Sequence, residues 1–340
     1  MHPYEDLRAT AFWKPGVAEP EGGEIADLWI PRFEIHRGDA IVTAGSCFAQ
    51  NLGRALRNNN MNWLVTETPP KGLPRSLHAA NGYGLFSFRT GNIYSPVLLH
   101  QWLVWAFDPA RISDEVWQDG GRFFDPFRPS VRSTGFDSAE EVIASRAATA
   151  RAVREAVLQA KVFIYTPGLT ETWVNTQSRE IYPACPGTVC GLFDPAMHRC
   201  VNVGFQAGKD ALVKAFEIMK THNPEIKLLL TVSPVPITAT VTGSHVLQAS
   251  TYTKSVLRAL VGEFVAATPD TDYFPSYDLV SAAMLPESYF DENRRTITPQ
   301  GVEKVMQKFF EGLGHAGRIV PTGQGEIVCE DEILSFYGKS

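Results

Sequence analysis

Gly45, Ser46 and Cys47 could form a nucleophile site, because they stand where the apolar run 40–44 meets a helical pattern. A side chain at a strand-to-helix corner is exposed to substrate, and the backbone N–H groups that follow it can stabilise an oxyanion. A helix N-terminus also lowers the pKa of a thiol, which favours the thiolate of Cys47. The same residues equally suit a tight glycine turn capped by Ser46, with Cys47 packed in the core as a small apolar residue. The pattern alone leaves both interpretations open.

The composition indicates an ordinary globular chain: of 340 residues, 44% are apolar and 20% are charged. The net charge of −6 argues against a nucleic-acid partner, since phosphate binding needs a concentrated basic surface. No apolar run reaches the ~18 residues that a membrane helix requires, so we expect no membrane insertion. The start of the chain lacks the basic-then-apolar pattern of a signal peptide, which predicts a cytoplasmic, reduced protein.

Five cysteines are too few for a disulfide scaffold and do not form CxxC pairs. Cys185, Cys190 and Cys200 lie close together, with His198 as the only nearby addition. A structural zinc site needs four well-spaced ligands, so no metal site is predicted.

Short buried strands alternate with longer helical patterns along the chain. Strands are expected at 40–44, 161–167, 226–232 and 272–276, and helices at 48–56, 96–107, 139–161, 209–220, 246–266 and 299–312. Ser138 is a plausible N-cap of the third helix, with Glu141 as its capping-box partner. The region 168–205 lacks a helical period, which favours an insertion or a β-hairpin excursion, and 123–136 is expected to form an ordered surface loop.

This alternation predicts an α/β fold with a parallel sheet and helices on both faces. One domain is expected over 38–315, with a surface extension at 1–37 and a tail at 316–340. Ligands of such sheets bind beyond the carboxyl ends of the strands. The loops 45–47, 168–171 and 233–236 should therefore share one rim, with Ser233 in the pocket wall.

The stretch TAGSCFAQNLGRAL (43–56) resembles the signature of the GSCFA family. Six further segments follow in the family's order: RTGNIYS (89–95), DPFRP (125–129), TPGLTETW (166–173), LTVSPVPITAT (230–240), TKSVLRA (253–259) and YFPSYDLV (273–280). The family is similar to the SGNH (GDSL-type) hydrolases and acyltransferases. That resemblance implies a three-layer α/β/α sandwich with a mainly parallel sheet and flavodoxin-like topology.

The SGNH pattern places its nucleophile two positions after a glycine, which here is Cys47, with Ser46 at the position of the usual Asp. A capsule-biosynthesis family with a Gly-Asn-Cys element is similar at this point and also favours a thiol. The resemblance therefore ranks Cys47 ahead of Ser46 as the catalytic nucleophile.

The oxyanion block of that pattern, Gly-x-Asn-Asp, corresponds to Gly168, Leu169, Thr170 and Glu171. Thr170 has one hydroxyl to donate, so its implied oxyanion role is weakened. Glu171 is expected to order the neighbouring loops, and Gly91 or Asn92 to supply a further donor.

The block that should carry the catalytic His and Asp departs from the family pattern. In NRRTITPQGV (293–302) the expected His falls on Thr296 and the expected Asp on Asn293, while Asp291 lies two residues upstream. Thr cannot act as a general base near neutral pH. His78, His100 or His245 would have to substitute from elsewhere in the fold.

Two functions from different classes follow. The first is an SGNH-like esterase or acyltransferase that acts on an acylated carbohydrate or similar metabolite, without metal or cofactor, and with acyl-CoA as donor if the reaction is a transfer. The alternative is a non-catalytic carbohydrate-binding or scaffold protein that has lost the dyad. Trp173 and Tyr277 are candidates to line the cleft in either case, and the oligomeric state is left open. Asp125 and Arg128 are expected to pair with each other rather than bind phosphate.

Overall fold

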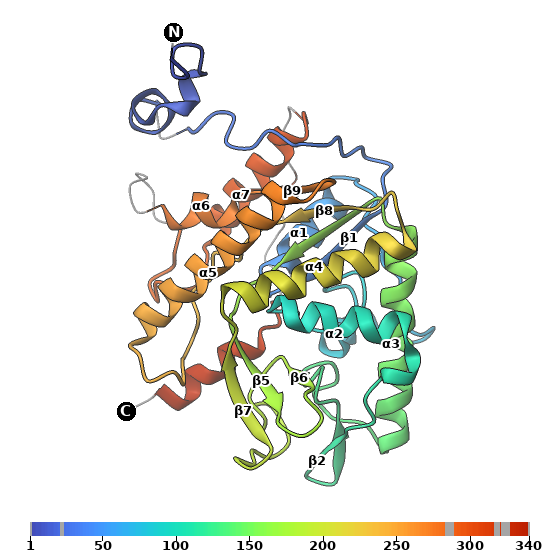
Figure 1. The fold of residues 1–340 in the computed structure, drawn as a ribbon. Coiled ribbons are helices and arrows are strands. Elements are labelled where there is room, and N and C mark those ends of the chain that lie inside the picture. Colours follow the sequence, from blue (N-terminus) through green and yellow to red (C-terminus); the bar gives the residue numbers. More distant parts are fainter. Residues whose placement is uncertain (1, 21–23, 283–288, 316–319, 321–326, 339–340) are drawn as a thin grey trace.

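A parallel sheet forms the centre of the computed structural model, which describes residues 2–20, 24–282, 289–315, 320 and 327–338 (Figure 1). Within these residues its strands run in the order β1 (Ile41–Gly45), β4 (Val162–Thr166), β8 (Lys227–Leu230) and β9 (Thr271–Tyr273). All three pairings are parallel, as expected. Strands buried on both faces are rich in apolar residues, which is why β1, β4 and β8 were recognisable in the sequence.

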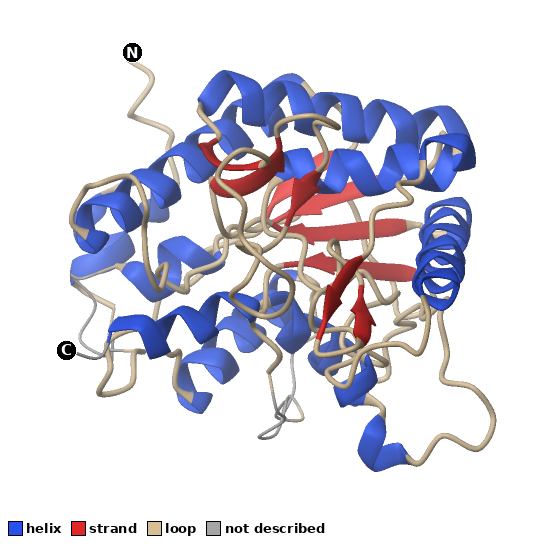
Figure 2. Cartoon of the chain, turned by 90° about the horizontal axis from the view of Figure 1, so that it is seen from below, coloured by secondary structure: helices blue, strands red, loops and turns tan. Residues whose placement is uncertain are grey.

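Helices cover both faces of this sheet (Figure 2). One face carries α2 (Pro96–Phe107), α3 (Ala139–Gln159), α4 (Phe205–His222) and α5 (Val246–Ala267), and the other carries α1 (Ala49–Asn58), α6 (Ser276–Ser281) and α7 (Pro299–Gly312). Successive residues of a strand point to opposite faces of the sheet. Val42 and Ala44 belong to the core on the side of α2, α3, α4 and α5, and Ile41 belongs to the core on the side of α1, α6 and α7. The fold is therefore a three-layer α/β/α sandwich, as the resemblance implied.

A one-residue remnant of a further strand lies beside β1. Trp63 forms an isolated parallel bridge with Ile41, whose N–H donates to the Asn62 carbonyl at 2.9 Å. With this remnant counted as the second strand, the order becomes 2-1-3-4-5, which is the flavodoxin-like order. The polar segment around it gave no strand signal in the sequence.

The excursion after β4 is an antiparallel sheet of β5 (Glu171–Asn175), β6 (Ile181–Tyr182) and β7 (His198–Asn202), in the order β6-β5-β7. A second hairpin joins β2 (Trp117–Asp119) to β3 (Arg122–Phe124). The excursion prediction is confirmed. The predicted surface loop 123–136 is wrong in part, because Asp125, Phe127 and Arg128 are almost completely buried.

The predicted helices are all present, with shifts at their ends. Ser138 caps α3 by accepting a hydrogen bond from the Glu141 N–H at 3.3 Å. The Glu141 carboxylate accepts from the N–H of Asp137 rather than from that of Ser138, so the capping box is displaced by one residue. The helix α4 begins at Phe205, four residues before the predicted start, and α6 was not predicted.

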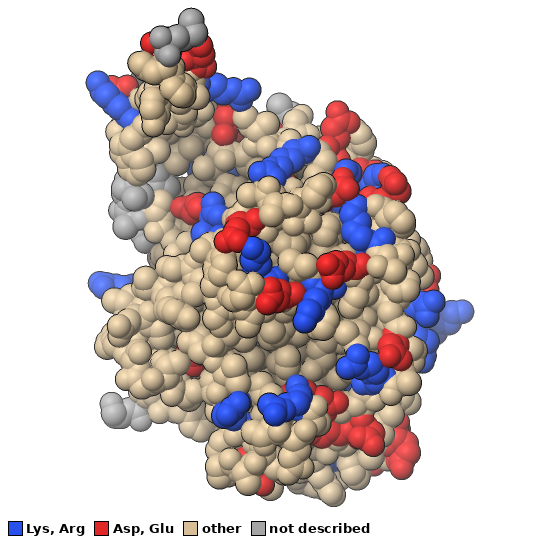
Figure 3. All heavy atoms as spheres, in the orientation of Figure 1, with Lys and Arg blue, Asp and Glu red and all other residues tan. Residues whose placement is uncertain are grey.

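The N-terminal extension is anchored through Trp29. Its ring stacks on Phe309 with centroids 5.6 Å apart, and its indole N–H donates to Asp272 at 3.1 Å. Residues 2–20 project away from the sandwich (Figure 1). Acidic and basic side chains are interspersed over the face in Figure 3. Within the described part of the chain, no helix is both long and apolar enough to cross a membrane.

Gly45 is required at the end of β1. Its φ is +140°, and a Cβ there would lie 2.5 Å from the carbonyl oxygen of Thr166 on the neighbouring strand. We expect Gly45→Ala to lower the free energy of unfolding by about 2–4 kcal/mol, from backbone strain and the clash together. Urea unfolding would measure the loss. Gly38→Ala is the control, since a Cβ at Gly38 meets nothing within 4 Å. Equal midpoints for the two variants would contradict the argument.

Candidate active site

The three loops predicted to share a rim do meet at the carboxyl end of the sheet. The Ser46 N–H donates to the Thr166 carbonyl at 2.8 Å, and the Ser233 N–H donates to the Pro167 carbonyl at 2.9 Å. A Cβ on Gly168 would lie 2.9 Å from the Ser46 Cβ and 3.4 Å from the Ser233 Cβ. Gly168 thus permits the close approach of the loops after β1, β4 and β8.

Cys47, and not Ser46, faces a cavity. Cys47 lines a space of about 100 Å³ together with Phe48, Asn51, Val235, Arg295, Thr296, Ile297, Val302, Ile327, Cys329 and Glu332. The Ser46 hydroxyl is buried and has no hydrogen-bond partner among the described residues. It does not cap α1 either, because the N-cap position is Phe48. The capped-turn interpretation of Ser46 is therefore wrong.

The Cys47 thiol is hydrogen-bonded to the thiol of Cys329. This bond and burial together raise the pKa of Cys47 well above its ordinary value. The bond from Cys47 lowers the pKa of Cys329, although burial acts in the opposite direction. The two thiols therefore titrate as a coupled pair, in which loss of a proton is favoured at Cys329 over Cys47.

Cys329 belongs to a C-terminal segment, residues 327–338, that lies over the site. The backbone of Val328 is held on both sides: its carbonyl accepts from the side-chain amides of Gln50 at 2.7 Å and Asn92 at 3.0 Å. Its N–H donates to Gln50 at 3.2 Å. The Gly91-Asn92 turn, predicted to supply an oxyanion donor, therefore directs the Asn92 amide at a carbonyl oxygen of this segment.

Two acidic side chains hold the same segment in place. Glu330 is buried and accepts from Asn92, from the Tyr94 hydroxyl at 3.0 Å and from the Ser130 hydroxyl at 2.8 Å. A Cβ on Gly91 would lie 3.4 Å from its Oε1. Asp331 accepts from Arg295 at 2.7 Å and from the hydroxyl and N–H of Thr238.

Lys254 brings a buried amine to the rim. It is 4% exposed, and its Nζ donates to the Gly168 carbonyl at 2.8 Å. Burial lowers its pKa to about 7, against the opposing charges of Cys47 and Asp331. An amine with that pKa is substantially neutral at physiological pH and can accept a proton.

The oxyanion block takes a different position from the one expected. The Thr170 hydroxyl is paired with that of Thr253 at 2.9 Å, and Thr170 does not line the Cys47 cavity. Glu171 accepts from the Thr240 hydroxyl at 2.6 Å and from the Val241 N–H at 3.2 Å. Glu171 thereby fixes the loop after β8, in keeping with the loop-ordering role expected of it.

The segment at the expected dyad folds as a tight turn. Asn293 Oδ1 accepts from the N–H groups of Arg295 and Thr296, both at 2.9 Å. Thr296 lines the Cys47 cavity, whereas Asn293 and Asp291 do not. The Asp291 N–H donates to the Thr296 carbonyl at 2.8 Å, which closes the turn.

None of the histidines proposed as substitutes lines the Cys47 cavity. His78 contacts the Leu73 carbonyl at 3.0 Å, and His245 caps α5. His100 lies on α2, where burial and then the charge of Lys214 lower its pKa.

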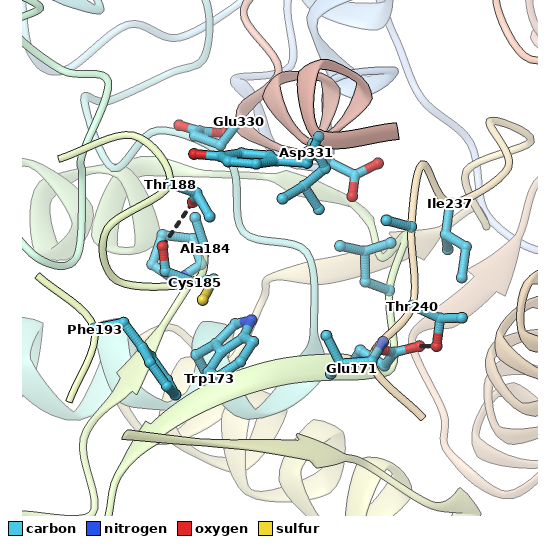
Figure 4. Close-up of a pocket in the computed structure, with 16 residues that line it drawn as sticks. Glu171, Trp173, Ala184, Cys185, Thr188, Phe193, Ile237, Thr240, Glu330 and Asp331 are labelled. Atoms are coloured by element: carbon cyan, nitrogen blue, oxygen red, sulfur yellow. Dashed lines mark hydrogen bonds between the residues drawn. The ribbon is translucent and has the colours of Figure 1, made fainter. Parts of the chain in front are cut away.

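Figure 4 shows a second cavity, which is larger, at about 350 Å³, and mostly apolar. Trp173 and Phe193 form one side, with ring centroids 5.6 Å apart, and Glu330 and Asp331 lie opposite them. Tyr277 does not line it and packs against the core instead. Cys329 borders the smaller cavity and Glu330 the larger one, so residues 329–331 form the partition between the two.

The sequence model of the GSCFA family matches residues 40–309, most of the chain. The chain belongs to the GSCFA family. No curated protein matches it. The family match includes the Cys47 corner, Lys254 and the turn at Thr296, whereas Cys329 lies beyond its end.

The sequence patterns did not identify four residues of the site: Lys254, Arg295, Tyr94 and Cys329. Lys254 had a detectable signal, because it lies within the GSCFA segment TKSVLRA on the helical stripe of Ser250, Leu257 and Val261, all buried. Among the described residues, no group of three or more His, Cys, Asp or Glu side chains is placed to hold a metal.

Proposed function

We propose that this GSCFA protein is an esterase or acyltransferase in which Cys47 is the nucleophile and Lys254 is the general base. The observation that carries the proposal is the buried Lys254 amine, with a pKa near 7, on the rim that presents Cys47. It supplies the proton acceptor that the family pattern expects from a histidine, and it comes from α5 instead of the turn at 293–296. The substrate class that the resemblance implies is an acylated carbohydrate or similar metabolite.

In the first half of the proposed reaction, the Cys47 sulfur attacks the acyl carbonyl and its proton passes to neutral Lys254. The C–S bond forms, the bond to the leaving oxygen or sulfur breaks, and the leaving group takes the proton back from Lys254. Water or an acceptor hydroxyl then attacks the thioester, again with Lys254 as base, and Cys47 is regenerated as a thiol. Acyl-CoA is the proposed donor if the reaction is a transfer, and the chemistry needs no metal.

Asn92 is the best-supported oxyanion donor. Its amide already donates to a carbonyl oxygen, that of Val328, in the segment that lies over the site. The backbone N–H of Cys47 is a second donor at the same corner. Thr170 instead acts through Thr253 as a positioning residue for α5, the helix that carries Lys254. Residues 327–331 must move aside before an acyl group can reach Cys47.

The alternative, a carbohydrate-binding or scaffold protein, is favoured by two observations. The turn at 293–296 contains no acid or base directed at Cys47, and the larger cavity displays the aromatic side chain of Trp173. Such a protein would bind a ligand without forming a covalent bond.

The deciding experiment follows the intact mass of the full chain during incubation with p-nitrophenyl acetate or with acetyl-CoA. We expect a single acetyl adduct that is absent in Cys47→Ala and retained in Ser46→Ala. Cys185→Ala is the matched control, since Cys185 is a partly buried thiol on the other cavity. No adduct and no turnover with either donor would favour the binding protein, whereas an adduct that persists in Cys47→Ala would refute Cys47 as the nucleophile.

A further inference from the structure

Cys47 and Cys329 are two free thiols that line one cavity. They come from distant parts of the chain, the corner after β1 and the C-terminal segment, and their thiols are hydrogen-bonded to each other. The Tyr94 hydroxyl lies 3.6 Å from the Cys329 sulfur. Since both thiols line the cavity, a small oxidant that enters it meets the pair together.

The other three cysteines lack these properties. Burial raises the pKa of Cys185 to about 11, and that of Cys190 and Cys200 to about 12. Cys329 differs, because a thiol donor lowers its pKa and the Arg295 guanidinium is near enough to interact with its charge. The thiolate is the form that reacts with oxidants, so Cys329 is the thiol from which we expect the reaction to begin.

The C-terminal segment fixes the register of this contact. Glu330, the residue after Cys329, is held by Tyr94 and Ser130, and Val328, the residue before it, by Gln50 and Asn92. A shift of the segment by one residue would break both sets of bonds. Cys329 is therefore positioned opposite Cys47 by its neighbours on either side.

We propose that Cys47 and Cys329 form a reversible disulfide that closes the C-terminal segment over the candidate active site. The oxidant is a peroxide. The Cys329 thiolate attacks a peroxide oxygen, the O–O bond breaks, and water or an alcohol leaves, which gives a sulfenic acid on Cys329. The Cys47 sulfur then attacks the Cys329 sulfur, the S–S bond forms and water leaves. Two electrons pass from the two thiols to the peroxide, and a small-molecule thiol returns them by exchange.

The disulfide would block acyl chemistry in two ways. It consumes the Cys47 sulfur, and it holds the Val328 carbonyl on the Asn92 amide. This consequence rests on the proposed function, whereas formation of the disulfide does not.

The test treats the full reduced chain with a small excess of hydrogen peroxide, alkylates the remaining thiols and maps the peptides without reduction. We expect one new cross-link, between the Cys47 and Cys329 peptides, that dithiothreitol removes. Cys329→Ser should abolish it, and the matched control Cys200→Ser should leave it intact. A cross-link to Cys185, Cys190 or Cys200, or sulfinic acid at Cys47 or Cys329 without a cross-link, would overturn the proposal.

Acetyl-adduct formation, measured on the same samples, separates the two proposals. We expect the oxidised chain to form the adduct at least about ten-fold more slowly than the reduced chain, and dithiothreitol to restore the rate. A cross-link in a chain that forms no adduct when reduced would refute the proposed function and leave the disulfide standing. An adduct without any cross-link would refute the disulfide alone.

Discussion

Replacing Lys254 by Met is expected to slow acylation of Cys47 by a factor of about 10² to 10⁴, the usual contribution of a general base. Met keeps the length and apolar stem of the side chain but cannot accept a proton. Stopped-flow measurement of p-nitrophenol release in a single turnover would test this. Lys214→Met, on the exposed side of α4, is the matched control and should react at the wild-type rate.

The pH dependence distinguishes a base from a merely structural lysine. Because the pKa of Lys254 is about 7, the wild-type acylation rate should rise with pH through that value as the amine becomes neutral. In Lys254→Met this rise should vanish, and only a rise at higher pH from ionisation of Cys47 should remain. If the pH–rate profile of the variant kept its inflection near pH 7, that inflection would belong to a group other than Lys254.

The stability of the same variant provides an independent check. The folded-state pKa of Lys254 is about 7, below the ordinary value of 10.5, so the unfolded chain binds more protons between these values. The stabilisation of the neutral buried amine is therefore fully present above 10.5 and is lost as the pH falls to about 7. Lys254→Met should unfold at higher urea concentration than the wild type at pH 6, and this advantage should shrink by pH 9.5. If Lys254→Met were acylated more slowly and were also less stable than the wild type at pH 6, the result would indicate a packing defect rather than the loss of a base.

The parallel sheet and its rim were predictable because they depend on local signals. The strands β1, β4 and β8 are short, mostly apolar runs, and the carboxyl ends of parallel strands meet at one edge. The loops at Ser46, Gly168 and Ser233 therefore had to converge. The strand remnant at Trp63 was not predictable, since a single bridge requires no apolar run.

Two parts of the site depend on contacts that no local pattern encodes. The C-terminal segment, in which Glu330–Gly338 form a 3-10 helix, reaches the rim through long-range hydrogen bonds to Gln50, Asn92 and Arg295. The proposed replacement of the catalytic histidine by Lys254 is equally non-local. Thr296 lines the Cys47 cavity at the position where the family pattern expects the histidine, while the proposed base, Lys254, comes from α5. A family motif specifies the base at one position of the sequence. It does not detect a residue elsewhere in the chain that reaches the same rim in the fold.

Replacing Asp125 by Asn is expected to lower the free energy of unfolding by about 3–5 kcal/mol, the cost of breaking a buried ion pair on one side. Asp125 contacts Arg128 at 2.7 Å and Arg146 at 3.0 Å, and none of the three side chains is exposed. Asn would leave two guanidinium groups buried without their shared anion. Urea unfolding at pH 7 measures the loss, with the exposed pair of Asp137 and Arg122 as the control: Asp137→Asn should cost far less.

Lowering the pH should reproduce part of this loss of stability in the wild type. Burial alone would raise the pKa of Asp125, but Arg146 and Arg128 outweigh it, so the pKa lies below the ordinary value of 3.8. The stabilisation is therefore present above pH 3.8 and is lost as the pH falls below that value.

The same geometry decides whether DPFRP forms an internal ion pair or a phosphate site. Arg128 is also bonded to Thr149 at 2.6 Å and has no face left for a phosphate. Phosphate should consequently not raise the unfolding midpoint of Asp125→Asn more than that of Asp137→Asn, and a selective rescue would show that an anion can enter beside Arg128.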